Sequence, residues 1–204
     1  MPLVSTEGFR LWPGRLDEAA QAALLDEVLT RLAEAPLYRP ITPGGKPMSV
    51  EMSGFGPVGW VTDARGYRYQ ETHPVTGRPW PAIPQPLLDL WRDLACAGTA
   101  PDACLVNLYR DGAKMGLHQD RDEADFGFPV LSVSLGDTAV FRLGGTRRGD
   151  PTRSLRLGSG DVCLLAGGAR LAHHGIDRIL AGSSRLIPGG GQINLTLRKA
   201  RAAL

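Results

Sequence analysis

The second half of the chain carries the pattern that most restricts its fold. From Ala103 onward, short runs rich in β-branched and other apolar residues alternate with Gly, Asp and Pro. The runs read A-C-L-V-N-L-Y, V-L-S-V-S-L, A-V-F-R-L, S-L-R-L, D-V-C-L-L and I-N-L-T-L-R. Short strands at regular spacing with turn residues between them are typical of a sandwich, jelly roll or barrel. We therefore expect a β-sheet core over about residues 103–200.

The first half predicts two helices instead. Asp17 is placed to cap a helix that runs to Glu34, and Pro84 and Pro86 suit the first turn of a second helix. Apolar residues recur at helical spacing at Leu24, Leu25, Val28, Leu29 and Leu32, and again at Leu87, Leu88, Trp91, Leu94 and Ala95. Both helices are expected to pack against a sheet. Helices first and strands later define the α+β class.

The segment between the helices, residues 38–81, is rich in Gly and Pro yet holds several aromatic residues, among them Trp60 and Tyr67. Aromatic side chains in a turn-rich segment indicate a shaped surface rather than a linker. The runs V-G-W-V and Y-R-Y are predicted to form a hairpin.

The length and charge of the chain limit its organisation more than its partners. A chain of 204 residues fits a single domain, residues 1–204, and we find no internal repeat. No exposed heptad indicates assembly, so a monomer is expected. A net charge of +2 is too small to indicate nucleic-acid binding by itself. Arginines gather at Arg142, Arg147, Arg148, Arg153 and Arg156, either as a phosphate-contacting edge or as a solvated surface.

Cysteine usage and the N-terminal sequence predict a cytoplasmic protein. The three cysteines, Cys96, Cys104 and Cys163, leave one unpaired in any disulfide scheme, which favours buried thiols in a reducing compartment. The first residues lack the pattern of a targeting peptide. No apolar run approaches the roughly 18 residues of a membrane span, so no membrane association is expected.

A His-x-Asp motif ends the stretch N-L-Y-R-D-G-A-K-M-G-L-H-Q-D. If His118 and Asp120 lie on one strand edge, their spacing points both side chains to the same face. A third ligand would come from His173 or His174, and the residues alone leave this choice open. Two histidines and a carboxylate form the facial triad of non-haem Fe(II) oxygenases. The same ligands around zinc would predict hydrolysis instead.

The last predicted strand supplies a candidate site for a carboxylate. Strand alternation places Asn194, Thr196 and Arg198 on one face, where an arginine can bind a carboxylate with two hydrogen bonds. Asn107 and Tyr109, also two residues apart, can contribute further donors to a dicarboxylate. The alternative for Arg198 is a surface salt bridge near the terminus.

These segments together resemble the AlkB family of Fe(II)/2-oxoglutarate dioxygenases. The resemblance rests on P-D-A-C-L-V-N-L-Y through H-Q-D-R-D-E, L-S-V-S-L-G, G-D-V, H-G-I and N-L-T-L-R, and it extends from M-S-V-E-M through P-W-P-A-I-P. It implies a double-stranded β-helix, or jelly roll, with flanking helices, preceded by a nucleotide-recognition segment at about residues 38–81. It also implies Fe(II), 2-oxoglutarate and O₂ as cofactor and cosubstrates.

The resemblance assigns roles to individual residues. It implies that the catalytic metal ligands are His118, Asp120 and His174, and that 2-oxoglutarate is bound by Asn107, Tyr109, Asn194 and Arg198. One position departs from the family pattern. The family commonly has a second arginine six residues before the position of Arg198, where this chain has Gln192. Arg185 or the G-G-G loop at residues 189–191 are candidates to compensate.

The resemblance also implies a substrate. Trp60 matches an aromatic residue that stacks on a damaged base, Tyr67 a contact on the phosphate side, and Asp122 a residue near the exocyclic amine. Arg148, from the arginine group, is a further candidate contact. Without the resemblance, Trp60 would be predicted as a core residue and Asp122 as part of a solvated acidic turn.

The function expected from these assignments is oxidative dealkylation of bases such as 1-methyladenine and 3-methylcytosine, coupled to conversion of 2-oxoglutarate to succinate. Single-stranded DNA is the expected substrate, since a base that is already unpaired flips at lower cost. Alternatives are a 2-oxoglutarate oxygenase acting on RNA or protein, a nucleic-acid binding module with an inactive site, and a metal-dependent hydrolase.

Overall fold

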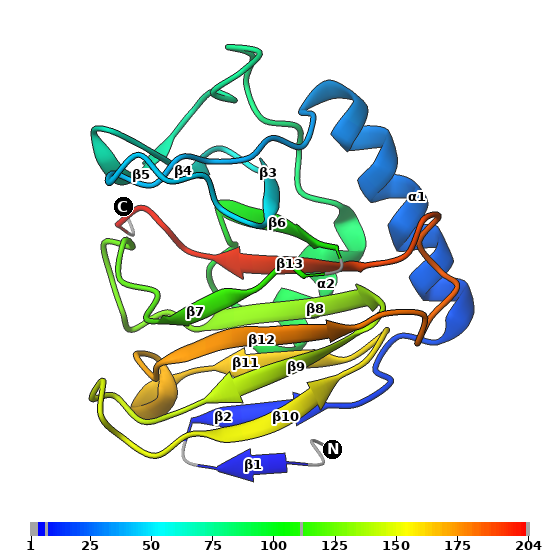
Figure 1. Cartoon of the computed structure of the whole chain (residues 1–204), viewed down its shortest axis with the longest axis vertical. Helices are drawn as coiled ribbons and strands as arrows, with labels where there is room; N and C mark the ends of the chain where they lie inside the picture. The colour runs from blue at the N-terminus through cyan, green and yellow to red at the C-terminus, as the bar shows by residue number, and fades with distance from the viewer. Residues whose placement is uncertain (1–3, 7, 111, 203–204) are drawn as a thin grey trace.

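Two antiparallel β-sheets form the centre of the molecule (Figure 1). The computed structural model describes residues 4–6, 8–110 and 112–202. The larger sheet has the strand order β1 (Val4–Thr6), β2 (Phe9–Trp12), β11 (Val162–Leu165), β8 (Val130–Gly136), β13 (Gln192–Arg198), β6 (Ala103–Tyr109) and β3 (Glu51–Phe55). The smaller sheet has the order β10 (Arg153–Leu157), β9 (Thr138–Leu143), β12 (His174–Leu180) and β7 (Met115–His118).

One apolar cluster lies between the two sheets. Leu105, Val130 and Leu165 of the larger sheet join Phe141 and Ile176 of the smaller sheet in this cluster. Two antiparallel sheets that bury facing surfaces in this way form the expected jelly roll.

The helices cover the opposite face of the larger sheet. Helix α1 (Glu18–Glu34) begins at Asp17, whose carboxylate accepts the N–H of Ala20 at 2.8 Å, as expected for the predicted N-cap. Helix α2 (Gln85–Leu94) has proline in its first turn. Their apolar faces pack with the larger sheet in a second cluster, and Figure 1 shows α1 running along one side of the strands. Both predicted helices are confirmed.

Strand alternation gives β13 and β6 two unlike faces. On β13, Ile193, Leu195 and Leu197 belong to the cluster under the helices. The intervening polar residues are Gln192, Asn194, Thr196 and Arg198. On β6, Cys104, Val106 and Leu108 face the helices, while Asn107 and Tyr109 alternate with them. The faces of these strands that are turned away from the helices are therefore partly polar.

The sheets also use strands that the sequence did not predict. The larger sheet draws β1, β2 and β3 from before residue 103, so the expected range 103–200 for the sheet core is too narrow. The strands β7 and β12 were also missed. Each of these segments is short or interrupted by polar and glycine residues, and its strand conformation depends on pairing with a strongly apolar neighbour such as β6 or β9.

The predicted hairpin is present as β4 (Gly59–Asp63) paired with β5 (Gly66–Gln70). It forms a separate two-stranded sheet, drawn above β13 in Figure 1. All three cysteines are free thiols. Among the described residues, no helix has the length and apolar character needed to cross a membrane.

A buried carboxylate holds the loop that leads into β13. Asp137, between β8 and β9, accepts the N–H of Gly191 at 2.8 Å and that of Ser184 at 2.9 Å. Burial alone would raise the pKa of Asp137, but these backbone N–H groups outweigh burial and hold the pKa below its usual value. Gly191 has φ +98°, and a Cβ there would lie 2.7 Å from the Tyr109 carbonyl oxygen, so the loop requires glycine at this position.

We expect Asp137→Asn to lower the free energy of unfolding by about 1–3 kcal/mol at neutral pH, because a buried N–H then faces an amide instead of a carboxylate. The folded-state pKa is depressed, so this stabilisation exists above the unfolded-state pKa and is lost as the pH falls through the folded value. Urea unfolding should therefore show a smaller difference between the two proteins at about pH 3 than at about pH 7.

The matched control is Asp26→Asn, at an exposed position of α1. It should change stability by no more than about 0.5 kcal/mol. Equal losses in both variants would contradict the role given to Asp137.

Candidate active site

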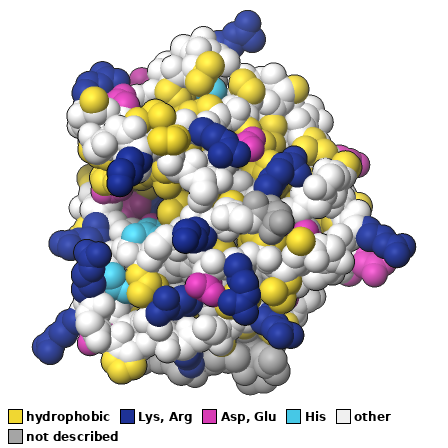
Figure 2. Space-filling view, viewed as in Figure 1, with side chains coloured by type: hydrophobic (Ala, Val, Ile, Leu, Met, Phe, Trp, Pro, Cys, Tyr) yellow, Lys and Arg dark blue, Asp and Glu magenta, His cyan; other side chains and the backbone are white. Residues whose placement is uncertain are grey.

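A cavity of about 390 Å³ opens between the two sheets and beneath the β4–β5 hairpin. Its lining combines apolar residues such as Leu105 and Phe141 with the polar faces of β6 and β13. Figure 2 shows histidine and carboxylate side chains meeting in a hollow on the face drawn, with Lys and Arg side chains around it. A concave, largely apolar cavity with a few convergent polar groups is the usual form of a small-molecule site.

His118, Asp120 and His174 meet in this cavity, and their ligand atoms all lie within 4.8 Å of one another. His118 ends β7, and His174 begins β12 directly opposite it in the register of the two strands. The Nε2 atoms of the two histidines each lie 3.8 Å from an oxygen of Asp120. The structure thus brings together the three residues implied as metal ligands.

Both imidazoles are held in the tautomer that suits a metal ligand. Nδ1 of His118 lies 2.9 Å from the Gly116 carbonyl oxygen, and Nδ1 of His174 lies 3.0 Å from that of Ala172. Because a carbonyl oxygen only accepts, Nδ1 carries the proton and the Nε2 lone pair faces Asp120. Burial lowers the pKa of His174 to about 4, so this imidazole is neutral at physiological pH.

Asp120 is ionised by its surroundings. Arg198 Nη2 lies 2.9 Å from its Oδ1, and Arg198 Nε lies 3.3 Å from its Oδ2. Burial alone would raise the pKa of Asp120, but the positive charge of Arg198 outweighs burial and holds this pKa well below its usual value. Two imidazole lone pairs and one carboxylate at this spacing fit a divalent metal with open positions.

The structure separates His173 from this group. His173 is the neighbour of His174, so its side chain leaves the strand start in another direction, and its Nδ1 lies 3.3 Å from the Gly145 carbonyl oxygen. The choice that the residues alone left open is therefore decided by register: His174, and not His173, is paired with His118. The expectation that Asp120 shares a strand with His118 is wrong, because β7 ends at His118 and Asp120 follows it.

A polar wall next to the three ligands fits a dicarboxylate. Asn107, Tyr109, Asn194 and Arg198 all line the cavity, as expected. Asn194 donates to Ser132 Oγ at 2.6 Å and accepts from Thr196 at 2.7 Å. The Asn107 Oδ1 atom is buried without a hydrogen-bond partner in the described part of the chain. A carboxylate cannot donate to this oxygen, so the side chain of Asn107 can offer a dicarboxylate only its NH₂ group. Amide, phenol and guanidinium donors are suited to the carboxylates of 2-oxoglutarate.

The departure at Gln192 leaves this wall with less positive charge. Gln192 is fully buried and donates to the Leu157 carbonyl oxygen at 3.2 Å. Arg185 is exposed and is not among the residues that line the cavity. The 189–191 loop contributes turns at its glycines but no charge. Neither candidate brings a second cation to the cavity, whose buried cation among the described lining residues is Arg198.

The hairpin supplies an aromatic wall to the same cavity. Trp60 of β4 and Tyr67 of β5 line it, with ring centroids 5.5 Å apart and planes 17° apart. The Trp60 indole N–H donates to Asp122 at 2.7 Å, so Asp122 is at the cavity and fixes the orientation of the indole. Tyr67 is 52% exposed, which leaves its ring accessible from solvent. Trp60 is only partly buried. It is therefore not the core residue that the sequence would predict without the family resemblance.

Arg148 is not brought to this site. It lies in the exposed turn between β9 and β10 and is not among the residues that line the cavity. Arg148 is close in sequence to the other arginines of this group, which is why it was a candidate. However, β10 is the edge strand of the smaller sheet, and the turn that contains Arg148 leads into it.

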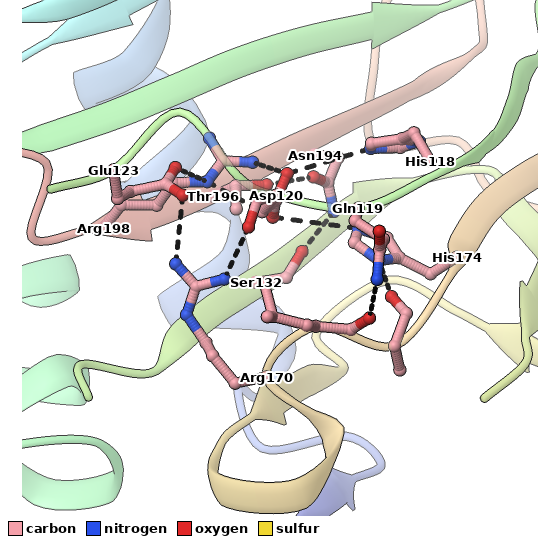
Figure 3. A network of polar contacts seen from close by, with 12 residues as sticks. His118, Gln119, Asp120, Glu123, Ser132, Arg170, His174, Asn194, Thr196 and Arg198 are labelled. Carbon is pink, nitrogen blue, oxygen red and sulfur yellow. Dashed lines mark hydrogen bonds and ion pairs between the residues drawn. The ribbon is translucent and has the colours of Figure 1, made fainter. Parts of the chain in front are cut away.

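Sequence reasoning missed three residues that hold the site together (Figure 3). Glu123 is only 6% exposed and pairs with both Arg170 and Arg198. Arg170 also donates to the Asp120 carbonyl oxygen at 2.9 Å. Gln119, between two ligands, donates to the Thr146 carbonyl oxygen at 3.1 Å. No local pattern marks these residues, because their partners are distant in sequence.

Comparisons with known proteins agree with this geometry. Residues 8–198 match the family model described as the 2OG-Fe(II) oxygenase superfamily. Over 202 residues the chain is 66% identical to "Alpha-ketoglutarate-dependent dioxygenase AlkB homolog" of Caulobacter vibrioides (strain NA1000 / CB15N). The alignment covers 99% of this chain and 92% of the relative. It is 32% identical over 199 residues to "DNA N(6)-methyladenine demethylase ALKBH1C" of Arabidopsis thaliana, covering 82% of this chain and 43% of that protein.

A solved structure described as "The structure of OsALKBH1" superimposes with a TM-score of 0.80 at 30% identity, covering 96% of this chain and 99% of the other. The predicted jelly roll is thereby confirmed. The chain belongs to the AlkB family of 2OG-Fe(II) oxygenases, and its cofactor and cosubstrates are Fe(II), 2-oxoglutarate and O₂.

Proposed function

We propose that this dioxygenase removes alkyl groups from damaged nucleic-acid bases, of the 1-methyladenine and 3-methylcytosine type, in single-stranded DNA. One observation carries the proposal: the stacked pair Trp60 and Tyr67 lines the same cavity as His118, Asp120 and His174. A planar base that enters beside the indole would place a substituent on its ring toward the three ligands. Stacking of bases on aromatic side chains is a common device for holding a flipped nucleotide.

The proposed roles follow from position in the cavity. His118, Asp120 and His174 would hold Fe(II). Asn107, Tyr109, Asn194 and Arg198 would bind 2-oxoglutarate. Asp122 is placed to accept from the exocyclic amine of the base, and the hairpin region, residues 38–81, would be the nucleotide-recognition segment. We also propose that the protein acts as a monomer, because the proposed site needs no residue from a second copy.

The bound cofactor and cosubstrates supply the oxidising power, and the protein supplies binding and orientation. One oxygen atom of O₂ enters the N-alkyl carbon and the other enters succinate, as 2-oxoglutarate loses CO₂. The hydroxylated carbon then leaves as an aldehyde, its C–N bond breaks, and the base recovers its nitrogen lone pair. The apolar lining from Leu105 and Phe141 limits water around the reacting carbon.

The relatives support a nucleic-acid substrate without fixing the lesion. The Arabidopsis relative is named for removal of methyl from N6 of adenine in DNA. An N6-methyl group lies on the exocyclic amine, whereas a 1-methyl group lies on the ring and leaves that amine free to donate to Asp122. The free amine is the reason for preferring ring-alkylated bases.

We expect His174→Ala to weaken Mn(II) binding by about tenfold or more, because one of three protein ligands is lost. His173→Ala is the matched control, since it removes the adjacent imidazole that faces Gly145. Electron paramagnetic resonance of free Mn(II) measures both affinities. Equal weakening by the two variants would contradict the assignment of His174.

We expect Trp60→Ala to weaken binding of an alkylated oligonucleotide by about 1–3 kcal/mol, the size of one stacking contact. Trp60→Phe should retain most of the affinity, because the ring remains while the hydrogen bond to Asp122 is lost. Fluorescence anisotropy with Mn(II) in place of Fe(II) measures binding without turnover. A silent Trp60→Ala variant would exclude base stacking at this position.

The decisive experiment loads the protein with Fe(II) and 2-oxoglutarate without oxygen and then admits O₂ with single-stranded DNA that carries 1-methyladenine. Loss of one methylene unit of mass, matched by succinate, supports the proposal. Parallel reactions contain 3-methylcytosine, N6-methyladenine, the same lesions in RNA, or a duplex. Turnover of N6-methyladenine or RNA alone would replace the proposed substrate, and binding without succinate would indicate an inactive binding module.

A further inference from the structure

A buried carboxylate beyond the three metal-site residues links the cavity to the hairpin. Glu123 follows Asp120 by three residues and is enclosed by two arginines and a tyrosine. Arg170 Nη2 lies 3.0 Å from its Oε2. Arg170 itself is fixed, since it also donates to the carbonyl oxygens of Asp120 and Phe128. Oxygen Oε2 of Glu123 therefore has a partner that is held in place by the backbone.

The other oxygen of Glu123 competes with Asp120 for one guanidinium. Arg198 Nε lies 3.3 Å from Glu123 Oε1 and also 3.3 Å from Asp120 Oδ2. The N–H at Nε donates to Asp120, and Glu123 lies against the same nitrogen as an ion pair, while Arg198 Nη2 lies 2.9 Å from Asp120 Oδ1 (Figure 3). Any change that strengthens the ion pair between Glu123 and Arg198 therefore weakens the interaction of Arg198 with Asp120.

The hairpin reaches the same oxygen. The hydroxyl of Tyr69, in β5, donates to Glu123 Oε1 at 2.6 Å. Glu123 Oε1 therefore lies between a hydroxyl that donates to it and the guanidinium of Arg198, with which it forms an ion pair. A continuous chain of contacts runs from Tyr69 through Glu123 and Arg198 to Asp120, and it joins the hairpin that carries Trp60 to a candidate metal ligand.

We propose that Glu123 is a positioning residue that divides Arg198 between Asp120 and the recognition hairpin, so that metal binding at Asp120 and the packing of β5 influence one another. The inference rests on the proposed function only in that a divalent metal binds at His118, Asp120 and His174. Its tests need no nucleic acid and no turnover.

The mechanism predicts opposite effects for two variants. In Glu123→Gln, Arg198 is left to Asp120 alone and a negative charge near the ion is lost, so Mn(II) should bind about tenfold more weakly. In Tyr69→Phe, Glu123 Oε1 loses a donor and attracts Arg198 more strongly. Asp120 is then freer to bind metal, and Mn(II) should bind about two- to fivefold more tightly.

Tyr38→Phe is the matched control for the loss of a phenolic hydroxyl. The Tyr38 hydroxyl is buried and has no hydrogen-bond partner within the described ranges, so its removal should leave Mn(II) affinity unchanged. Glu123→Gln removes the charged partner of Arg170. If that variant does not fold for this reason, the Mn(II) affinity of Tyr69→Phe alone tests the proposal. Tighter binding by Tyr69→Phe supports the proposal; unchanged or weaker binding overturns it.

Hydrogen exchange followed by mass spectrometry tests the link in the other direction. When Mn(II) draws Asp120 away from Arg198, Arg198 should turn toward Glu123 and compete with Tyr69, so amides of residues 59–70 should exchange faster. Tyr69→Phe should lose this response, and α1 should be unaffected in either protein. A response of equal size in Tyr69→Phe, or none in the unaltered protein, overturns the proposal. Failure to bind Mn(II) at all would instead contradict the metal site of the proposed function.

Discussion

Strand β13 has one face in an apolar core and the other at a polar cavity, and the rest of the molecule is arranged around this requirement. Its apolar residues Ile193, Leu195 and Leu197 lie under the helices, and its polar residues line the cavity or border it. The pairing with β6 runs from Gln192 opposite Tyr109 to Arg198 opposite Ala103. A shift of one residue would place Arg198 in the apolar core, so burial of one face fixes the geometry of the other.

The polar face would be unstable without internal charge balance. Asp120, Glu123, Arg170 and Arg198 are all buried, and an isolated buried charge costs several kcal/mol. The two carboxylates and two guanidiniums alternate in space, so each charge lies against an opposite one. Asp120 is therefore ionised and oriented before any metal arrives. A metal bound by Asp120 would have to share this carboxylate with Arg198, which would connect metal affinity to the contacts of that arginine.

The sequence was sufficient to predict an element where the conformation of that element depends mainly on its own residues. The run V-L-S-V-S-L predicts β8 because its apolar residues alternate, and Asp17 predicts the start of α1 because its cap is local. The strands β3 and β12 were not predictable in this way, since their conformation depends on neighbours. The residues alone could not choose between His173 and His174, because only the register of β12 against β7 places His174 opposite His118.

Glu123 and Gln192 show why the remaining part of the site needs the fold. Glu123 sits in a charged turn that reads as solvated, and its burial depends on Arg170, 47 positions away. Gln192 was recognised as a departure, but its consequence depends on which cations reach the cavity. With a neutral amide there, Arg198 is the buried arginine among the described residues that line the cavity, and it contacts both Asp120 and Glu123. The division of Arg198 among its partners therefore matters more here than in a site with a second buried arginine at the position of Gln192.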